Sequence, residues 1–198
     1  MFIYLGTLIS NDNIVEKEIQ RHISAGNRTY FTAISLFRSR LLSRATKIIL
    51  YKTLIRPVVS YGAEAWTLTK KEEQTLLIFE RKIFRRIYGP KYENGEWKSR
   101  TNRELEEMRK GETIVKWIKW QRISWLGHLE RKEEDWMPKK IFTQELEEMR
   151  RRGRLKKRWK EDVEGYLQVL GVRRWRELVA DRKKWKDIFR QVKAHSGL

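Results

Sequence analysis

The sequence predicts a mainly α-helical protein, with strand signal confined to the first ten residues. Three observations support this prediction. Apolar residues recur at spacings of three and four along most of the chain, which places them on one face of successive helices. Two T-x-x-E capping boxes mark helix starts at Thr69 and Thr101. Glycines stop two of the periodic segments, at Gly89 and Gly171.

Residues 2–10, FIYLGTLIS, combine β-branched and aromatic side chains around one glycine, which predicts a strand or half of a hairpin. A single hairpin is at most marginally stable in water, and no partner strand follows in the sequence. We therefore expect residues 1–12 to be the remnant of a larger sheet.

A long helix is expected from Asn13, because its apolar stripe continues at helical spacing as far as Leu41. Gly26 lies in that stripe, where it costs helix stability but lets another backbone approach closely. Ser43 is a candidate N-cap for the next helix. Pro57 interrupts that helix, so a kink or a restart is expected there.

A third helix begins at the Thr69 capping box and ends at Gly89 and Pro90. Three helices with short connections predict a small three-helix bundle over residues 13–90. Cations gather in the last turns of the third helix, where the helix dipole favours positive charge. They are Arg81, Lys82, Arg85 and Arg86.

Residues 91–100, KYENGEWKSR, hold turn residues without a periodic pattern, which favours a linker. Residues 101–198 are expected to form a second small helical domain, because eight of the nine tryptophans follow residue 96. Tryptophan fills small helical cores or stacks on unpaired bases, and the core role is the usual one. Trp159, between Arg158 and Lys160, is the tryptophan that we expect to be exposed, although it also begins an apolar stripe.

The chain has 45 Lys and Arg against 26 Asp and Glu, a net charge of +19. Such a chain repels itself unless a polyanion neutralises it, and nucleic acid is the most common partner of this kind. Eight of the eleven residues of the run 150–160, RRRGRLKKRWK, are basic and none is acidic. Like charges in this number cannot be buried, so the run faces water or a polyanion, or serves as a nuclear-import signal.

Several functional classes are disfavoured by what the sequence lacks. The absence of cysteine excludes disulfides and thiolate–metal sites, and the three histidines lack metal-ligand spacing. No apolar run approaches the length of a membrane-spanning helix, and no secretory signal begins the chain. The acidic residues 133–135 are interpreted as a solvated loop that balances neighbouring cations. We therefore expect no metal, no cofactor, no membrane contact and no secretion.

Stretches along essentially the whole chain, in order, match a known family. The longest is LLSRATKIILYKTLIRPVVSYGAEAWTLTKKEEQTLLIFERKIFRRIYGP at residues 41–90. The others are FIYLGTLIS, W-x-G-H-x-x-R at Trp125, Gly127, His128 and Arg131, Pro138-Lys139-Lys140, G-R-x-x-x-R-W from Gly153 to Trp159, and LGVRRW with DRKKW. Together they resemble the C-terminal part of LINE-type (non-LTR) retrotransposon endonuclease–reverse transcriptases.

The resemblance implies an architecture, a partner and a location. In the family, the YLG segment lies at the end of the palm, the next helices resemble the thumb that grips the template–primer duplex, and the remainder looks like the C-terminal nucleic-acid-binding region. RNA and DNA are thus the implied partners, and the nucleus, otherwise the cytoplasm, is the implied location. The chain departs from the family at Leu155, where proline is frequent, and has no counterpart of the zinc knuckle of some relatives.

Catalysis by this chain alone is not expected. Two-metal polymerisation requires carboxylates close together, which the family supplies from a paired-aspartate motif on the palm. The sequence has no such pair, no Gly-rich phosphate loop and no endonuclease motif. An intact parent would be an RNA-directed DNA polymerase. The aspartates of this chain fall on separate elements: Asp12, Asp135, Asp162, Asp181 and Asp187.

The candidate nucleic-acid contacts form two groups. The first brackets a helix–helix turn, where it would track a duplex backbone as a thumb does or form a solvated corner: Arg38, Arg40, Arg44 and Lys47. The second is the basic run, for which the resemblance favours phosphate contact. It comprises Arg150, Arg151, Arg152, Arg154, Lys156, Lys157, Arg158, Trp159 and Lys160.

Three functional hypotheses follow from the sequence. The first is a non-catalytic reverse-transcriptase fragment that binds template–primer RNA and DNA without sequence preference. The second is a helical protein-interaction module or an inactive gene relic, whose basic run serves only nuclear import. The third is polymerase activity that appears only with a separately encoded palm portion.

Overall fold

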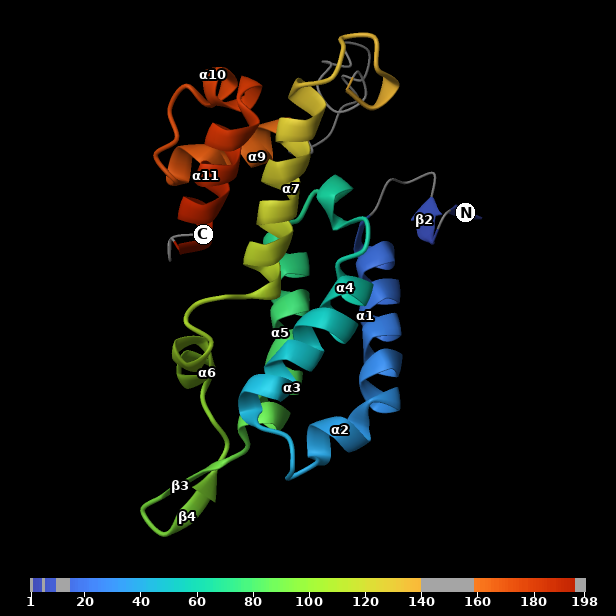
Figure 1. The fold of residues 1–198 in the computed structure, drawn as a ribbon. Helices are drawn as coiled ribbons and strands as arrows, with labels where there is room; N and C mark the ends of the chain where they lie inside the picture. Colours follow the sequence, from blue (N-terminus) through green and yellow to red (C-terminus); the bar gives the residue numbers. More distant parts are fainter. Residues whose placement is uncertain (1, 5, 10–14, 140–158, 195–198) are drawn as a thin grey trace. The chain divides into compact units, whose positions relative to one another are not determined.

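The computed structural model describes residues 2–4, 6–9, 15–139 and 159–194, and within them the protein is mainly helical (Figure 1). The predicted mainly α fold with an N-terminal hairpin is confirmed. Strands β1 (Phe2–Tyr4) and β2 (Thr7–Ile9) pair antiparallel around Gly6, whose φ of 83° suits a tight turn.

The chain divides into two compact units. Unit 1 comprises residues 1–62 and 68–115, and unit 2 comprises residues 63–67 and 116–198. Unit 1 contains β1, β2, α1 (Val15–Thr32), α2 (Ile34–Arg38), α3 (Arg44–Leu50), η1 (Tyr51–Ile55), α4 (Arg56–Val59), α5 (Lys70–Tyr88), β3 (Lys91–Glu93), β4 (Glu96–Lys98) and α6 (Asn102–Met108). Unit 2 contains η2 (Ala63–Ala65), most of α7 (Ile114–Glu130), α9 (Trp159–Val169), α10 (Trp175–Ala180) and α11 (Arg182–Ala194).

The long helix that was expected to continue from Asn13 as far as Leu41 is broken into two. Helix α1 ends at Thr32, α2 ends at Arg38, and the side chain of Leu41 is 96% exposed. The break after α2 has a local cause, because Ser39 is extended and its hydroxyl accepts a hydrogen bond from the backbone N–H of Leu41 at 3.2 Å. Serine side chains that bind the backbone in this way compete with the helix.

The other helix boundaries of unit 1 follow the sequence signals. The Ser43 hydroxyl accepts a hydrogen bond from Thr46 N at 3.1 Å and caps α3, as predicted. The capping boxes at Thr69 and Thr101 are both formed. Pro57 follows the π-helical turn η1 and lies in the first turn of α4, so the predicted kink or restart is confirmed.

Helices α1, α4 and α5 pack closely at Gly26. A Cβ atom there would lie 2.3 Å from Cγ2 of Val59 on α4 and 3.1 Å from Cζ of Phe79 on α5. The close approach predicted for Gly26 is thus confirmed. The core around it consists of fully buried apolar side chains, which include Ile19, Phe37, Tyr51, Ile55 and Leu76.

A buried carboxylate joins α5 to the segment that follows α6. Glu80 accepts hydrogen bonds from the Tyr51 hydroxyl at 3.0 Å, from Arg109 Nη1 at 2.5 Å and from the backbone N–H of Ile114 at 3.0 Å. Burial raises the pKa of Glu80, and the charge of Arg109 opposes that rise. Removing one partner of such a pair leaves a buried charge uncompensated, so this network holds the segment firmly on the bundle.

The expected linker at residues 91–100 is instead a β-hairpin that belongs to unit 1. Strands β3 and β4 pair antiparallel across Asn94 and Gly95, which have φ values of 54° and 83° as a two-residue hairpin turn requires. The boundary between the units falls within α7, between residues 115 and 116. It lies there because residues 101–115 are fixed to the bundle by the Glu80 network.

Unit 2 is built around tryptophans, as its composition indicates. Side chains of α7, α9, α10 and α11 form one buried cluster. Trp185 packs directly on Gly127, where a Cβ atom added to the glycine would lie 2.0 Å from the indole Nε1. The buried members of the cluster are Trp120, Ile123, Leu126, Leu129, Trp159, Val163, Leu167, Val179, Trp185 and Ile188.

Candidate nucleic-acid interface

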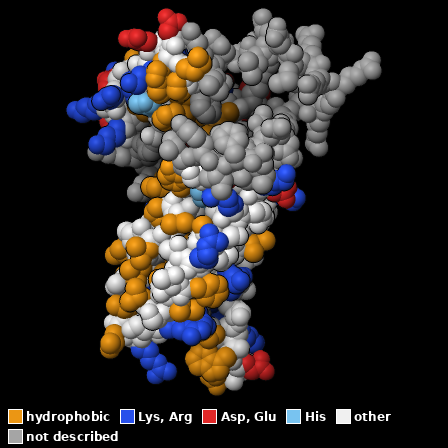
Figure 2. Space-filling model, turned by 90° about the vertical axis from the view of Figure 1, so that its right-hand side faces the viewer, with side chains coloured by type: hydrophobic (Ala, Val, Ile, Leu, Met, Phe, Trp, Pro, Cys, Tyr) orange, Lys and Arg blue, Asp and Glu red, His pale blue; other side chains and the backbone are white. Residues whose placement is uncertain are grey.

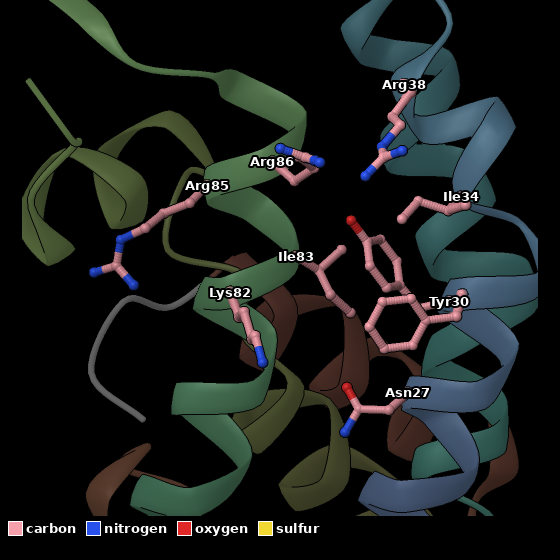
Figure 3. Close-up of a pocket in the computed structure, with 9 residues that line it drawn as sticks. Asn27, Tyr30, Ile34, Arg38, Lys82, Ile83, Arg85 and Arg86 are labelled. Carbon is pink, nitrogen blue, oxygen red and sulfur yellow. The ribbon is translucent and has the colours of Figure 1, made fainter. Parts of the chain in front are cut away.

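A groove in unit 1 lies between α1–α2 on one side and α5 on the other, with a volume of about 440 Å³ (Figure 3). Its walls carry aromatic, aliphatic and basic side chains and no carboxylate. We call it the basic groove, and its lining residues are Asn27, Tyr30, Phe31, Ile34, Arg38, Lys82, Ile83, Arg85 and Arg86.

The floor of the basic groove is apolar and partly aromatic. Tyr30 and Phe31 are in edge-on contact, with ring centroids 5.5 Å apart, and the Tyr30 ring also contacts the buried Phe37 ring at 5.3 Å. These contacts fix the orientation of Tyr30. Phe31 remains 60% exposed, which is unusual for a large apolar ring. The floor therefore offers flat apolar surface at the edge of solvent.

Three cations of the basic groove have no acidic partner among the residues that the structure describes: Arg38, Lys82 and Arg86. Figure 3 shows the guanidinium groups of Arg38 and Arg86 pointing toward each other from opposite walls. Like charges that converge in this way repel each other unless an anion lies between them. The arrangement is therefore suited to hold a phosphate or another anionic group.

Arg85 has a different role from its neighbours, although it also lines the groove. Its guanidinium donates to Asn102 Oδ1 at 2.6 Å and to the carbonyl oxygen of Arg100 at 3.4 Å. In Figure 3 it points away from Arg38 and Arg86. Arg85 therefore connects α5 to the start of α6 and does not contribute its charge to the centre of the groove.

The first predicted group of contacts is brought together at the α2–α3 turn. Arg38 is the last residue of α2 and lines the groove, Arg40 is exposed in the turn, and Arg44 and Lys47 lie on α3. Arg44 lies near Tyr88, the last residue of α5. Burial raises the pKa of Tyr88, and the nearby charges of Arg109 and Arg44 oppose this rise. Figure 2 shows one face of the protein, on which Lys and Arg are interspersed among apolar side chains.

The second predicted group lies mostly outside the described residues. Arg150, Arg151, Arg152, Arg154, Lys156, Lys157 and Arg158 fall in the range 140–158, which the structure does not describe. Lys160 is half-buried, and its ammonium lies 3.3 Å from Glu130 Oε1.

The expectation that Trp159 is exposed is wrong. Its side chain is buried, and its indole N–H donates to the carbonyl oxygen of Glu64 at 2.7 Å within unit 2. The physical reason is the apolar stripe that Trp159 begins: Val163 and Leu167 continue it one and two turns later, and both are fully buried. Packing of this stripe outweighs the effect of the charged neighbours in sequence.

Sequence reasoning assigned no binding role to Lys82, Arg86, Tyr30 or Phe31. Lys82 and Arg86 were interpreted as cations that the dipole favours near the end of their helix, and Tyr30 falls within the apolar stripe predicted for the first helix. One signal was present, because Lys82 and Arg86 are four residues apart and share a face of α5. That this face meets Arg38 depends on the break between α1 and α2, which the periodicity did not indicate.

Two candidate sites in unit 2 have structural partners. His128 stacks on Trp125, with ring centroids 5.2 Å apart, and meets Trp136 edge-on. Burial lowers the pKa of His128, and nearby cations lower it further. In the acidic segment 133–135, Glu134 is bound to the buried ammonium of Lys139.

In the part of the chain that the structure describes, no group of three or more His, Asp or Glu side chains is arranged to hold a metal ion. Within the same residues, no helix is both long enough and apolar enough to cross a membrane.

The fold and the groove define a mainly helical, strongly basic protein with a cation-lined, aromatic-floored cleft. No protein-family model matches the chain, and no solved structure matches it. The chain is similar to an uncharacterised transposon-derived protein of Caenorhabditis elegans. The two are 21% identical over 201 residues, which cover 98% of this chain and 72% of that protein. The chain is thus a distant homologue of a transposon-derived protein.

Proposed function

We propose that this protein binds RNA and DNA duplexes without sequence preference, as the thumb and C-terminal part of a LINE-type reverse transcriptase would, and that the basic groove of unit 1 holds the phosphate backbone. The observation that carries the proposal is the convergence of Arg38 and Arg86 from opposite walls of the basic groove, whose lining also includes Lys82, Tyr30 and Phe31. The distant homology to a transposon-derived protein supports the same origin.

The chemistry of the basic groove fits a sugar–phosphate backbone. Arginine binds phosphate oxygens through paired N–H donors, and lysine binds them as a point charge. Apolar rings beside the cations suit the faces of sugars. Contacts of this kind position a duplex but carry no base information, so the binding is sequence-nonspecific. The net charge of +19 adds attraction at longer range.

In this proposal the chain holds nucleic acid and does not itself polymerise. The aspartates of the described residues support that view, because two of them have structural roles. Asp162 is buried and bound to Arg122 at 2.5 Å, and Asp181 accepts the backbone N–H of Lys183 at 2.7 Å at the start of α11. Polymerisation would require a palm portion with paired aspartates, and an assay of residues 1–198 with such a portion added would reveal it.

The test compares two charge-matched variants. Arg38→Gln with Arg86→Gln removes the two converging charges of the basic groove. Lys70→Gln with Lys110→Gln removes two exposed cations of unit 1 outside the groove lining. The assay is the affinity for a labelled RNA–DNA duplex at low salt.

We expect the groove variant to lose about tenfold or more in affinity, because each phosphate contact contributes strongly at low ionic strength. The control variant should lose about twofold or less, as expected for a change in general attraction only. Equal losses in the two variants would refute the assignment of the groove. Loss of nuclear import without any change in duplex affinity, on replacing the basic residues of 150–158 by serine, would instead favour the import hypothesis.

A further inference from the structure

The β3–β4 hairpin exposes two large aromatic rings on one face. Tyr92 is 63% exposed and Trp97 is 70% exposed. They lie directly opposite each other in the hairpin register, with ring centroids 5.2 Å apart and planes inclined by 60°. Among exposed apolar side chains of unit 1, these two form a contiguous aromatic surface, which we call the hairpin aromatic face.

The opposite face of the hairpin carries only charges, and they neutralise one another. Because side chains alternate along a strand, the pairs Lys91–Lys98 and Glu93–Glu96 lie on the face away from the rings. The ammonium of Lys91 is 2.9 Å from Glu93 and that of Lys98 is 3.8 Å from Glu96. The hairpin thus separates its side chains into a charged face that is internally paired and an aromatic face without charge.

A purely structural role does not account for the hairpin aromatic face. A cross-strand aromatic pair stabilises a hairpin, and the ring contact between Tyr92 and Trp97 serves that purpose. More than half of the surface of each residue is nevertheless exposed to solvent, where it is available to a flat apolar partner.

The hairpin is held firmly at the C-terminal end of α5, next to the basic groove. Arg100 Nε donates to the carbonyl oxygen of Gly89 at 3.1 Å, and Lys91 binds Glu104 on α6 at 2.6 Å. Arg86, which lines the groove, lies in the last turn of α5. Figure 1 shows the hairpin projecting beyond this end of the helix. The hairpin therefore lies beyond the end of α5 that carries the groove residue Arg86.

We propose that the hairpin aromatic face stacks on unpaired bases of the nucleic acid whose backbone lies in the basic groove. The proposal rests on the proposed function. It names a more specific ligand, a junction between duplex and single strand. Every unpaired base offers a flat π-face, so stacking on Tyr92 and Trp97 is independent of sequence. The cations beside the groove favour a polyanion over a neutral protein partner at this end of unit 1.

The test uses two probes, a blunt duplex of about 20 base pairs and the same duplex with a single-stranded overhang of about six nucleotides. The variant Tyr92→Val with Trp97→Val removes the rings but keeps strand-forming residues. The control, Ile49→Ala with Ile78→Ala, removes two other apolar side chains of unit 1 that are 58% and 62% exposed.

We expect the unchanged protein to prefer the overhang probe by about tenfold, the gain from stacking at least one base. The valine variant should lose this preference and keep its affinity for the blunt duplex, and the alanine control should keep both. Tyr92→Phe with Trp97→Phe retains the rings and should retain the preference, which separates stacking from hairpin folding. A valine variant that still prefers the overhang, or that loses blunt-duplex affinity equally, would overturn the proposal.

Two further outcomes separate this proposal from the proposed function. In the first outcome, Arg38→Gln with Arg86→Gln binds both probes as tightly as Lys70→Gln with Lys110→Gln does, while the valine variant loses the overhang preference. The groove assignment then fails and the stacking proposal stands. If the valine variant changes only the sedimentation of the protein, from dimer to monomer, the hairpin aromatic face is a contact between copies and the stacking proposal is wrong.

Discussion

Unit 1 and unit 2 each place arginine beside aromatic rings, with opposite consequences. In unit 2, Arg122 is fully buried; it binds Asp162 at 2.5 Å and the Tyr166 hydroxyl at 2.8 Å, and its guanidinium carbon lies 5.6 Å from the Trp159 ring centre. In unit 1, Arg38 and Arg86 line the basic groove together with Tyr30, and no carboxylate is among the lining residues.

The difference shows that an internal carboxylate decides what an arginine–aromatic cluster does. Where Asp162 is present, the charge of Arg122 is neutralised within the protein and the cluster stabilises the core of unit 2. In the basic groove, where no carboxylate is among the lining residues, we propose that the charge is left for an external anion.

Replacing Arg122 by methionine should destabilise unit 2 by about 3–5 kcal/mol, because it leaves the buried Asp162 without its cation. The measurement is the free energy of unfolding in urea. The double variant Arg122→Met with Asp162→Leu should recover much of the loss, since no buried charge remains. Near-equal stabilities of the single variant and the unchanged protein would show that the buried pair does not have the role assigned here.

Replacing Gly26 by alanine should destabilise unit 1 by about 1–3 kcal/mol, because the new Cβ would lie 2.3 Å from Val59 Cγ2. Gly165 is the matched control, a glycine within α9 whose Cβ would meet no atom within 4 Å. Gly165→Ala should stabilise the protein by about 0.5–1 kcal/mol through the higher helix propensity of alanine. Thermal unfolding followed by circular dichroism should therefore shift in opposite directions for the two variants.

The groove variant Arg38→Gln with Arg86→Gln should leave the free energy of unfolding within about 0.5 kcal/mol of the unchanged protein, because both side chains lack a carboxylate partner in the described residues. A slight gain in stability would also agree with this role, since the substitutions remove the repulsion between two like charges. The free energy of unfolding is measured in urea, on the same variant that is used in the duplex-binding assay. A loss comparable to that of Arg122→Met would mean that the groove cations are structural.

The smallest effect is expected at Glu104, which fixes the base of the hairpin. The hydrogen bond from Lys91, with those from the backbone and hydroxyl of Thr101, lowers the pKa of Glu104 from 4.5 to about 2. Because its pKa is lowered in the folded state, the ionised Glu104 carboxylate stabilises that state fully at pH values above 4.5. This contribution is lost as the pH falls toward about 2. The indole N–H resonance of Trp97 should shift over this range. In Glu104→Gln the shift should disappear, whereas Glu106→Gln should leave it unchanged.

The sequence was sufficient to predict the helical fold, the caps at Ser43, Thr69 and Thr101, and the close packing at Gly26. These features depend on local spacing and on residue types with few conformational alternatives. Residues 91–100 were interpreted as a linker, although Asn94-Gly95 is a strong hairpin signal, because strands of three residues show almost no alternation.

The candidate site was only partly predictable. Arg38 was expected as a contact, but its meeting with Lys82 and Arg86 depends on how α2 turns back toward α5, a tertiary feature. Trp159 was expected to be exposed because its sequence neighbours are basic. Its burial follows from Val163 and Leu167, which shows that helical periodicity outweighs the charge of adjacent residues.

If the basic groove neutralises phosphates, the salt dependence of duplex affinity reports how many it contacts. For duplex DNA, each neutralised phosphate contributes a slope of about −0.9 to the logarithm of affinity against the logarithm of salt concentration. Relative to Lys70→Gln with Lys110→Gln, the variant Arg38→Gln with Arg86→Gln should have a slope shallower by about 1.5–2. Identical slopes for the two variants would contradict the account.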